Sequence, residues 1–196
     1  MLGTTHSLIG LTTVAVVNGV YPFIQPHIIE KLPAGPIFCA VAAMVGALVP
    51  DLDAENSTIE QEMGLAGQLL SDTLKIFGVK HRGATHFGMA GLLVMAFALF
   101  IGYKAGYLDV GFAFGLGYIS HILADGCTKS GVPLFAPFKK DCVRILPRLL
   151  LVRTGSAAER LLALGITLSL FFVLPNLMIP ELEKFVRKVM SGGWPL

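Results

Sequence analysis

The chain has 196 residues, of which 54% are hydrophobic and 14% charged, and its mean hydropathy is +0.72. Soluble domains carry about a quarter charged residues, so this composition indicates an integral membrane protein. The net charge of +2 gives no basis for a nucleic-acid partner, and we expect none. The three cysteines, Cys39, Cys127 and Cys142, form no CxxC pair, which argues against a disulfide framework or a zinc–thiolate site. The N-terminus lacks a basic n-region, so no cleavable signal peptide is expected.

Five apolar segments are predicted to form helices, at about 7–24, 35–49, 87–103, 108–125 and 161–179. Several are nearer 15 residues than the ~20 that cross a hydrocarbon core, and the second, between Pro36 and Pro50, is short enough to be partly re-entrant. Asn18 and the glycines of the fourth segment (Gly111, Gly115 and Gly117) suggest helix faces packed against protein.

We therefore predict an all-α fold, an integral membrane bundle of about five apolar helices. It forms one domain, 1–196, with a core at 1–160 and a fifth span and amphipathic tail at 161–196. With five spans, the N-terminus and the stretches 51–86 and 126–160 share one side, which carries ten Lys and Arg residues against five on the other. The positive-inside rule makes that side cytoplasmic.

Two short stretches resemble each other. Gly3-Thr4-Thr5-His6 opens the first apolar segment and Gly83-Ala84-Thr85-His86 opens the third. Each begins a pair of segments that ends in a carboxylate, and two such helical hairpins would form a parallel repeat. Coincidence is the alternative, because Thr is a good N-cap anywhere. In both cases the polar groups gather at one end of the bundle.

His121 and Asp125 are the strongest candidate site residues, because their i, i+4 spacing puts both on one face of the fourth helix. Ionisable residues inside an apolar span are costly and mark functional sites. Imidazole and carboxylate together suit zinc, and also manganese or iron. The alternative is a His–Asp pair that only locks helix packing.

Asp51 and Asp53 follow Pro50, which helps to end the second helix. Alternation in an extended segment would send both carboxylates the same way. We predict both as ligands, with one or the other also available as general base; the alternative is a solvated acidic loop.

The segment His81–His86 is the densest polar cluster. Thr85 is a plausible N-cap for the third helix, with His86 in its first turn and His81 brought close by Gly83. Arg82 would hold a substrate anion or, equally, anchor the chain at the headgroups. His6, the counterpart of His86 in the first segment, completes the predicted ligands: His6, Asp51, Asp53, His81, His86, His121 and Asp125.

The segment 128–138 is apolar, aromatic and broken by prolines, which predicts an interfacial or re-entrant loop that covers the site. The Lys and Arg residues after it alternate with Leu149, Leu150 and Leu151. That pattern suggests an amphipathic helix at anionic headgroups.

Taken in order, these motifs resemble the bacterial YdjM-type inner-membrane proteins. The shared pattern is an N-terminal Thr-His, Pro-Asp-Leu-Asp at 50–53, His-Arg-Gly-x-Thr-His at 81–86, and Ser-His-x-x-x-Asp at 120–125 followed by Thr-x-x-Gly-Val-x-x-x-x-Pro-Phe at 128–138. The resemblance runs from Thr5 to about Phe138, and Phe87 replaces the family's usual Ser. It implies a membrane-bound, metal-dependent hydrolase of the bacterial inner (plasma) membrane; some members are part of the SOS response under LexA.

That family is in turn distantly similar to zinc-dependent phospholipase C and P1-type nuclease. The matching positions are His121 and Asp125, with Asp51 or Asp53, His81 or His86, and His6. Those enzymes also have a later His-x-x-x-Glu, and no His follows His121 here. The resemblance therefore implies one or two divalent ions rather than three.

The function expected from these features is phosphoester hydrolysis by a metal-activated water at the membrane face. A phospholipid is a fitting substrate, and Asp51, Asp53 and Arg82 are the candidate catalytic residues. The alternatives are ion or solute transport, and a structural membrane protein whose metal only staples the bundle.

Overall fold

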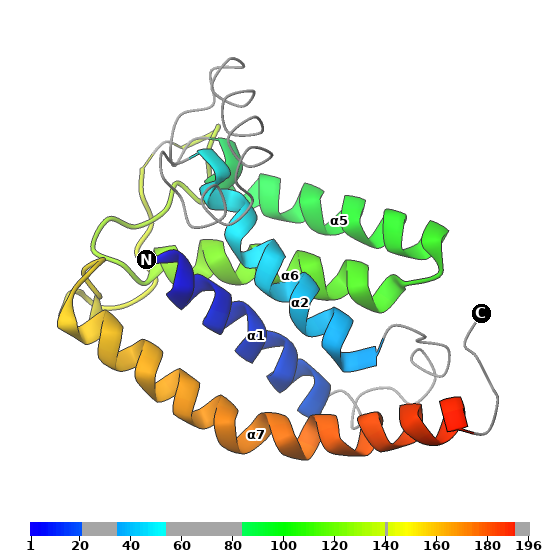
Figure 1. The fold of residues 1–196 in the computed structure, drawn as a ribbon. Coiled ribbons are helices and arrows are strands. Elements are labelled where there is room, and N and C mark those ends of the chain that lie inside the picture. Colours follow the sequence, from blue (N-terminus) through cyan, green and yellow to red (C-terminus); the bar gives the residue numbers. More distant parts are fainter. Residues whose placement is uncertain (21–34, 54–83, 140, 191–196) are drawn as a thin grey trace.

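The computed structural model is a bundle of α-helices (Figure 1). It describes residues 1–20, 35–53, 84–139 and 141–190. Within these residues the α-helices are α1 (Gly3–Val20), α2 (Gly35–Leu48), α5 (Gly88–Ala105), α6 (Leu108–Gly126) and α7 (Ala157–Met190). The described residues contain no β-strand beyond isolated bridges, so the predicted all-α fold is confirmed.

The C-terminal helix differs most from the prediction. A span at 161–179 and a separate amphipathic tail were expected, but α7 runs without interruption from Ala157 to Met190. It begins four residues earlier than predicted because Ser156 accepts a hydrogen bond from the Glu159 backbone amide and so caps its first turn. The fifth segment and the tail are therefore one helix (Figure 1).

The centre of the bundle is α6, which contacts α1, α2 and α5, whereas α7 packs mainly against α1 (Figure 1). Glycines let the helices approach closely. A Cβ at Gly117 would meet the carbonyl oxygen of Ala43 on α2, and one at Gly111 would meet that of Ala98 on α5. The glycine-rich face of α6 thus packs against protein, as predicted. The side chain of Asn18 lies outside the described residues.

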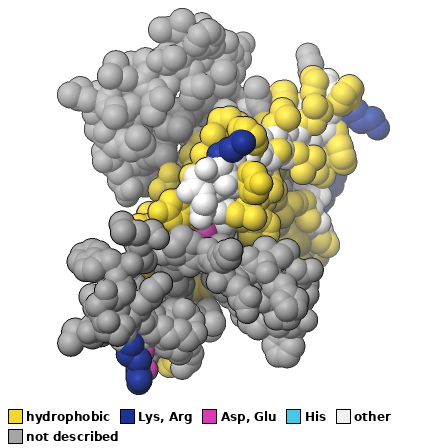
Figure 2. All heavy atoms as spheres, turned by 90° about the vertical axis from the view of Figure 1, so that its right-hand side faces the viewer, with side chains coloured by type: hydrophobic (Ala, Val, Ile, Leu, Met, Phe, Trp, Pro, Cys, Tyr) yellow, Lys and Arg dark blue, Asp and Glu magenta, His cyan; other side chains and the backbone are white. Residues whose placement is uncertain are grey.

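The outer surface of α5 is apolar and exposed. Among the described residues, α5 is the helix long and apolar enough to cross a membrane, and only 11% of its 18-residue window is buried. Leu92, Leu93 and Phe97 are each about two-thirds exposed, which a helix from a water-soluble core would not show. Figure 2 shows a largely hydrophobic described surface with scattered Lys and Arg side chains. A five-span bundle stays a prediction: within the described residues α5 is the helix that meets this test, and α2 is a shorter apolar helix.

The loop after α6 lies against the ends of α5 and α6. Val132 is buried with Tyr118 and Ile122, and the Gly88 amide donates to the Leu134 carbonyl at 2.9 Å. The segment 128–138 therefore lies at the helix ends, where a covering loop was expected. The amphipathic helix predicted after it is wrong: only a short 3-10 turn, Arg148–Leu150, forms behind Pro147. Isolated bridges such as Thr128–Val152 hold this loop extended instead.

Candidate metal centre

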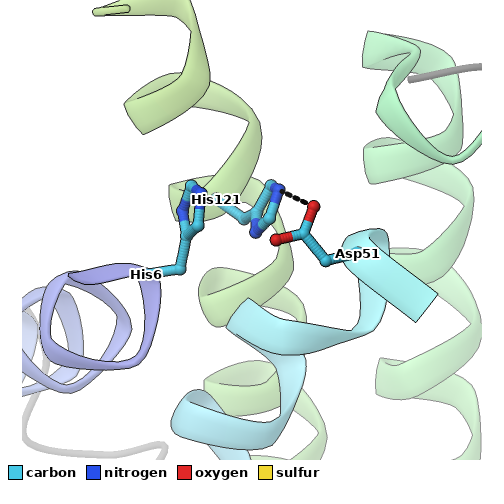
Figure 3. Close-up of side chains that lie close together, drawn as sticks. All are labelled: His6, Asp51 and His121. Carbon is cyan, nitrogen blue, oxygen red and sulfur yellow. Dashed lines mark ion pairs between the residues drawn. The ribbon is translucent and has the colours of Figure 1, made fainter. Parts of the chain in front are cut away.

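Three imidazoles and two carboxylates converge at the end of the bundle where α1 begins and α6 ends. His6 comes from the first turn of α1, and His121 and Asp125 from the last turns of α6. Asp51 and His86 come from short 3-10 segments, η2 (Val49–Asp53) and η3 (Ala84–His86). The three imidazoles are 0% exposed and Asp125 is 2% exposed, whereas Asp51 is 17% exposed. Figure 3 shows His6, His121 and Asp51 pointing toward one another.

The chain beyond α2 is helical rather than extended, which corrects one expectation. α2 ends at Leu48, and Pro50 lies in the 3-10 turn that follows. The 3-10 turn replaces the extended segment from which a shared direction of Asp51 and Asp53 was expected, so that argument no longer applies. The side chain of Asp53 lies outside the described residues.

Thr85 holds His86 rather than capping a helix. The residue at the N-cap of α5 is Phe87, in extended conformation and without a side-chain cap. Thr85 Oγ1 lies 3.0 Å from His86 Nδ1, and the Thr85 carbonyl accepts a hydrogen bond from the Tyr118 hydroxyl at 2.6 Å. The predicted N-cap role of Thr85 is therefore wrong, and His86 precedes α5 instead of lying in its first turn.

The hydrogen bond of His121 determines which of its nitrogens can bind a ligand. Nδ1 lies 2.7 Å from the carbonyl oxygen of Ala47, and because a carbonyl only accepts, Nδ1 carries the hydrogen. Nε2 of the neutral ring therefore presents its lone pair to the centre of the cluster. It lies 3.3 Å from His86 Nε2 and 3.5 Å from Asp51 Oδ1, and His86 Nε2 lies 3.7 Å from the same oxygen.

Two of these distances, 3.3 and 3.5 Å, match the ligand spacing of a tetrahedral zinc ion, and the third, 3.7 Å, is slightly longer. Tetrahedral zinc with bonds of about 2.0–2.2 Å holds its ligand atoms roughly 3.3–3.6 Å apart. Two overlapping groups, His6–Asp51–His121 and His86–His121–Asp125, each bring their ligand atoms within 4.8 Å of one another. The donor set of imidazole and carboxylate suits one or two divalent ions.

His6 supplies a second observation that points to an ion. Its ring stacks on that of His121, with centroids 3.6 Å apart, and its Nε2 lies 3.4 Å from Asp125 Oδ1. Among the described residues, neither ring nitrogen of His6 has a hydrogen-bond partner, although both are buried. Buried polar atoms are nearly always paired, so a bound cation is a fitting partner for this imidazole.

Asp51 carries its charge at neutral pH. Burial by itself would raise the pKa of Asp51, but the neighbouring His86 side chain outweighs this effect, and the pKa is lowered to about 2. Asp51 is also the most exposed member of the cluster.

Two residues beside the cluster did not emerge from the sequence. The amino group of Met1 donates to Asp125 Oδ1 at 2.6 Å. Glu159 of α7 is fully buried and accepts a hydrogen bond from the Leu2 amide at 2.6 Å. The only sequence signal for Glu159 was the Ser-x-x-Glu spacing from Ser156, which is typical of a capping box.

The structure brings together five of the seven predicted ligands: His6, Asp51, His86, His121 and Asp125. His81 and Arg82 lie outside the described residues, as does the side chain of Asp53. Metal binding by His81 and Asp53, and anion binding by Arg82, remain predictions.

Comparison with known proteins identifies the family. The family described as YdjM inner membrane protein matches residues 1–182, so the chain belongs to this family. The uncharacterized protein YvsG of Bacillus subtilis is 31% identical over 173 residues, which are 86% of this chain and 91% of that protein.

The inner membrane protein YdjM of Escherichia coli is 30% identical over 128 residues, 64% of this chain and 61% of that protein, and the YdjM protein of Shigella flexneri matches equally. These relationships support a membrane location. No solved structure matches, so the distant likeness to phospholipase C and P1 nuclease receives no support from these comparisons.

Proposed function

We propose that this protein is a membrane-bound, metal-dependent hydrolase that cleaves a phosphoester at the membrane face. The observation that carries the proposal is the buried cluster of His6, His86, His121, Asp51 and Asp125, whose ligand atoms lie at metal-ligand spacing. Four of these side chains are at most 2% exposed, and a buried group of this kind is expensive unless a cation or a full set of partners compensates it.

Each side chain has a part in the proposed reaction. A divalent cation held here would neutralise a phosphoryl group and acidify a water molecule. His121 and His86 direct their Nε2 atoms to the same point, and Asp125 lies between His6 and His86. Asp51 is ionised and is the most exposed of the five, so it is placed to take a proton from water if the metal leaves one of its oxygens free. Arg82 remains a candidate for holding the substrate anion.

A lipid is the substrate that the surroundings favour. The covering loop exposes Phe135 and Phe138, and the site lies where α5 begins. A cavity of about 630 Å³ lies between α2, α5 and α6, lined almost entirely by apolar side chains such as Phe38, Ile101 and Phe114. Its near end, at Phe114, lies seven residues or roughly 10 Å along α6 from His121. One acyl chain in this cavity would leave its headgroup near the cluster.

The test is hydrolysis by detergent-purified protein. Phospholipid vesicles and a soluble phosphodiester are offered separately, and released headgroup or alcohol is measured with and without a chelator. Asp51→Asn should reduce turnover by about 10²- to 10⁴-fold, the usual loss on removing a general base. Asp109→Asn, the same change at the far end of α6, should leave turnover unchanged. Wild-type protein inert on both substrates, or active regardless of chelator, would overturn the proposal.

The same experiment addresses the alternatives. The cluster lies at helix ends, whereas transport sites lie near the membrane midplane, so the geometry favours hydrolysis over transport. If the protein binds metal tightly, loses stability with the metal and hydrolyses neither substrate, the structural-staple alternative replaces the hydrolase.

A further inference from the structure

Helix α7 contributes one fully buried acid that has no part in the proposed reaction. Glu159 lies in the first turn of α7 and is 0% exposed. Its Oε1 accepts a hydrogen bond from the Leu2 amide at 2.6 Å, and its Oε2 accepts one from the Gly155 amide at 2.7 Å. The helix dipole favours an anion at this position. The carboxylate therefore ties the start of α7 to the residue that precedes α1.

Leu2 carries this connection to the metal cluster. While its amide donates to Glu159, its carbonyl oxygen accepts a hydrogen bond from the His6 amide at 3.1 Å. This second bond closes the first turn of α1, in which His6 lies. Two hydrogen bonds through one residue thus connect the buried carboxylate of α7 to the backbone of His6.

The three imidazoles of the cluster are held in different ways. His121 is oriented by the Ala47 carbonyl and His86 lies beside the Thr85 hydroxyl, each through Nδ1. Among the described residues, no hydrogen bond holds either ring nitrogen of His6. The position of its ring is therefore determined by stacking on His121, by the 3.4 Å ion pair of Nε2 with Asp125 Oδ1, and by where the backbone of α1 begins.

We propose that Glu159 is a positioning residue that keeps His6 in the metal centre through Leu2. The inference rests on the proposed metal site but not on hydrolysis. If Glu159 positions His6, the metal centre depends on the first turn of α7, although that turn contributes no ligand.

The first test measures metal affinity. In Glu159→Gln, one carboxylate oxygen becomes an NH₂ group, which cannot accept from the Leu2 or Gly155 amide, so one of the two bonds is lost. Loss of such supporting partners typically weakens metal binding 10- to 100-fold, and we expect that range for Zn²⁺ in competition with a chromophoric chelator. Ser156→Ala is the matched control, because it uncaps the same turn without touching Leu2; its affinity should equal that of the wild type.

A double-mutant cycle tests whether Glu159 acts through His6. If it does, Glu159→Gln should cause no further loss of Zn²⁺ affinity in a His6→Ala background. Losses that multiply, or wild-type affinity in both Glu159→Gln and Leu2→Pro, would overturn the proposal.

A readout without metal separates positioning from general destabilisation. Diethyl pyrocarbonate labels accessible imidazoles, and peptide mass spectrometry locates the label. Metal-free wild type and Ser156→Ala should protect all three histidines, whereas Glu159→Gln should expose His6 alone. Equal labelling of His6, His86 and His121 would contradict the proposal, and the result does not depend on whether the protein is an enzyme.

If Glu159→Gln does not fold, a second variant removes the donor of the hydrogen bond between the Leu2 amide and Glu159. Leu2→Pro removes the donating N–H while leaving the Leu2 carbonyl and Glu159 in place. It should reproduce the selective labelling of His6. Full protection of His6 in Leu2→Pro would overturn the proposal.

Discussion

Helices α5 and α6 are neighbours of almost equal length, 18 and 19 residues, yet their surroundings are opposite. In α5 only Gly91 and Gly102 are buried, while α6 has eleven buried residues, among them His121 and Asp125. Since α6 is surrounded by α1, α2 and α5, its polar side chains find partners from several elements. The exposed α5 has no such partners, and its central residues are all apolar. Burial by protein, not mean hydropathy, decides which helix can carry the site.

Removing the central imidazole of α6 should have the largest effect. His121 Nε2 is close to both His86 and Asp51, and His121→Ala removes the residue common to both candidate ligand groups. We expect metal content to fall from about one or two ions per chain to background, because a metal site needs its full number of protein ligands. Elemental analysis of detergent-purified protein measures this.

The neighbouring residue provides the control. Ser120→Ala alters an equally buried position of α6 whose hydroxyl donates only to the Gly117 carbonyl, so its metal content should match the wild type. If His121→Ala kept its metal, or Ser120→Ala lost it, the cluster would not be the metal centre.

The exposed face of α5 should be sensitive to charge in its middle and tolerant at its end. Ala96→Lys places an ammonium near the centre of the apolar helix. At this position a Lys raises the free energy of membrane insertion by about 2.5–3.5 kcal/mol. Tyr103→Lys lies in the last turn of α5, beside the native Lys104. Its ammonium can reach the membrane–water interface, so this change should raise the free energy of insertion only slightly. Glycosylation-mapping of membrane insertion compares the two. Equal insertion of both variants would count against α5 as a spanning helix.

Much of the fold followed from hydropathy. The predicted segments 35–49, 87–103 and 108–125 differ from α2, α5 and α6 by one or two residues, because apolar runs bounded by Pro, Gly and charge leave little choice. The extent of α7 could not be seen in the same way. Its beginning depends on Ser156 and Glu159, whose importance comes from a tertiary contact with Leu2.

The site was predictable as a set but not in its geometry. Two sequence patterns predicted polar groups at one end of the bundle: the similar stretches that contain His6 and His86, and the i, i+4 spacing of His121 and Asp125. Spacing could not show that Asp51 lies in a 3-10 turn rather than in an extended segment, nor that Thr85 contacts His86 through its hydroxyl. Those features depend on 3-10 turns, whose local signals are weaker than helical periodicity.

A substitution in the packed face of α6 should destabilise the protein more than a substitution on the exposed face of α5. In Gly117→Ala the new Cβ meets the Ala43 carbonyl of α2, so the helices must separate and we expect a loss of about 1–3 kcal/mol. Leu93→Ala on α5 removes more atoms from an exposed position, two-thirds open to the surroundings, and should cost less. Thermal denaturation in detergent ranks the two. A larger loss for Leu93→Ala would mean that α5 is covered in the working protein.

The smallest expected effect concerns the cavity between α2, α5 and α6. Ala42 lines it, and Ala42→Leu would fill part of the space proposed for an acyl chain. We expect about a tenfold loss of kcat/KM on long-chain phospholipids relative to short-chain ones, the scale at which apolar pockets discriminate methylene groups. Ala96→Leu, on the exposed face of α5 outside the cavity lining, should change neither substrate. Because Ala42 lies more than two helical turns from Asp51, metal content should be unaffected. An equal loss on both substrates would place the acyl chain elsewhere while leaving the metal centre untouched.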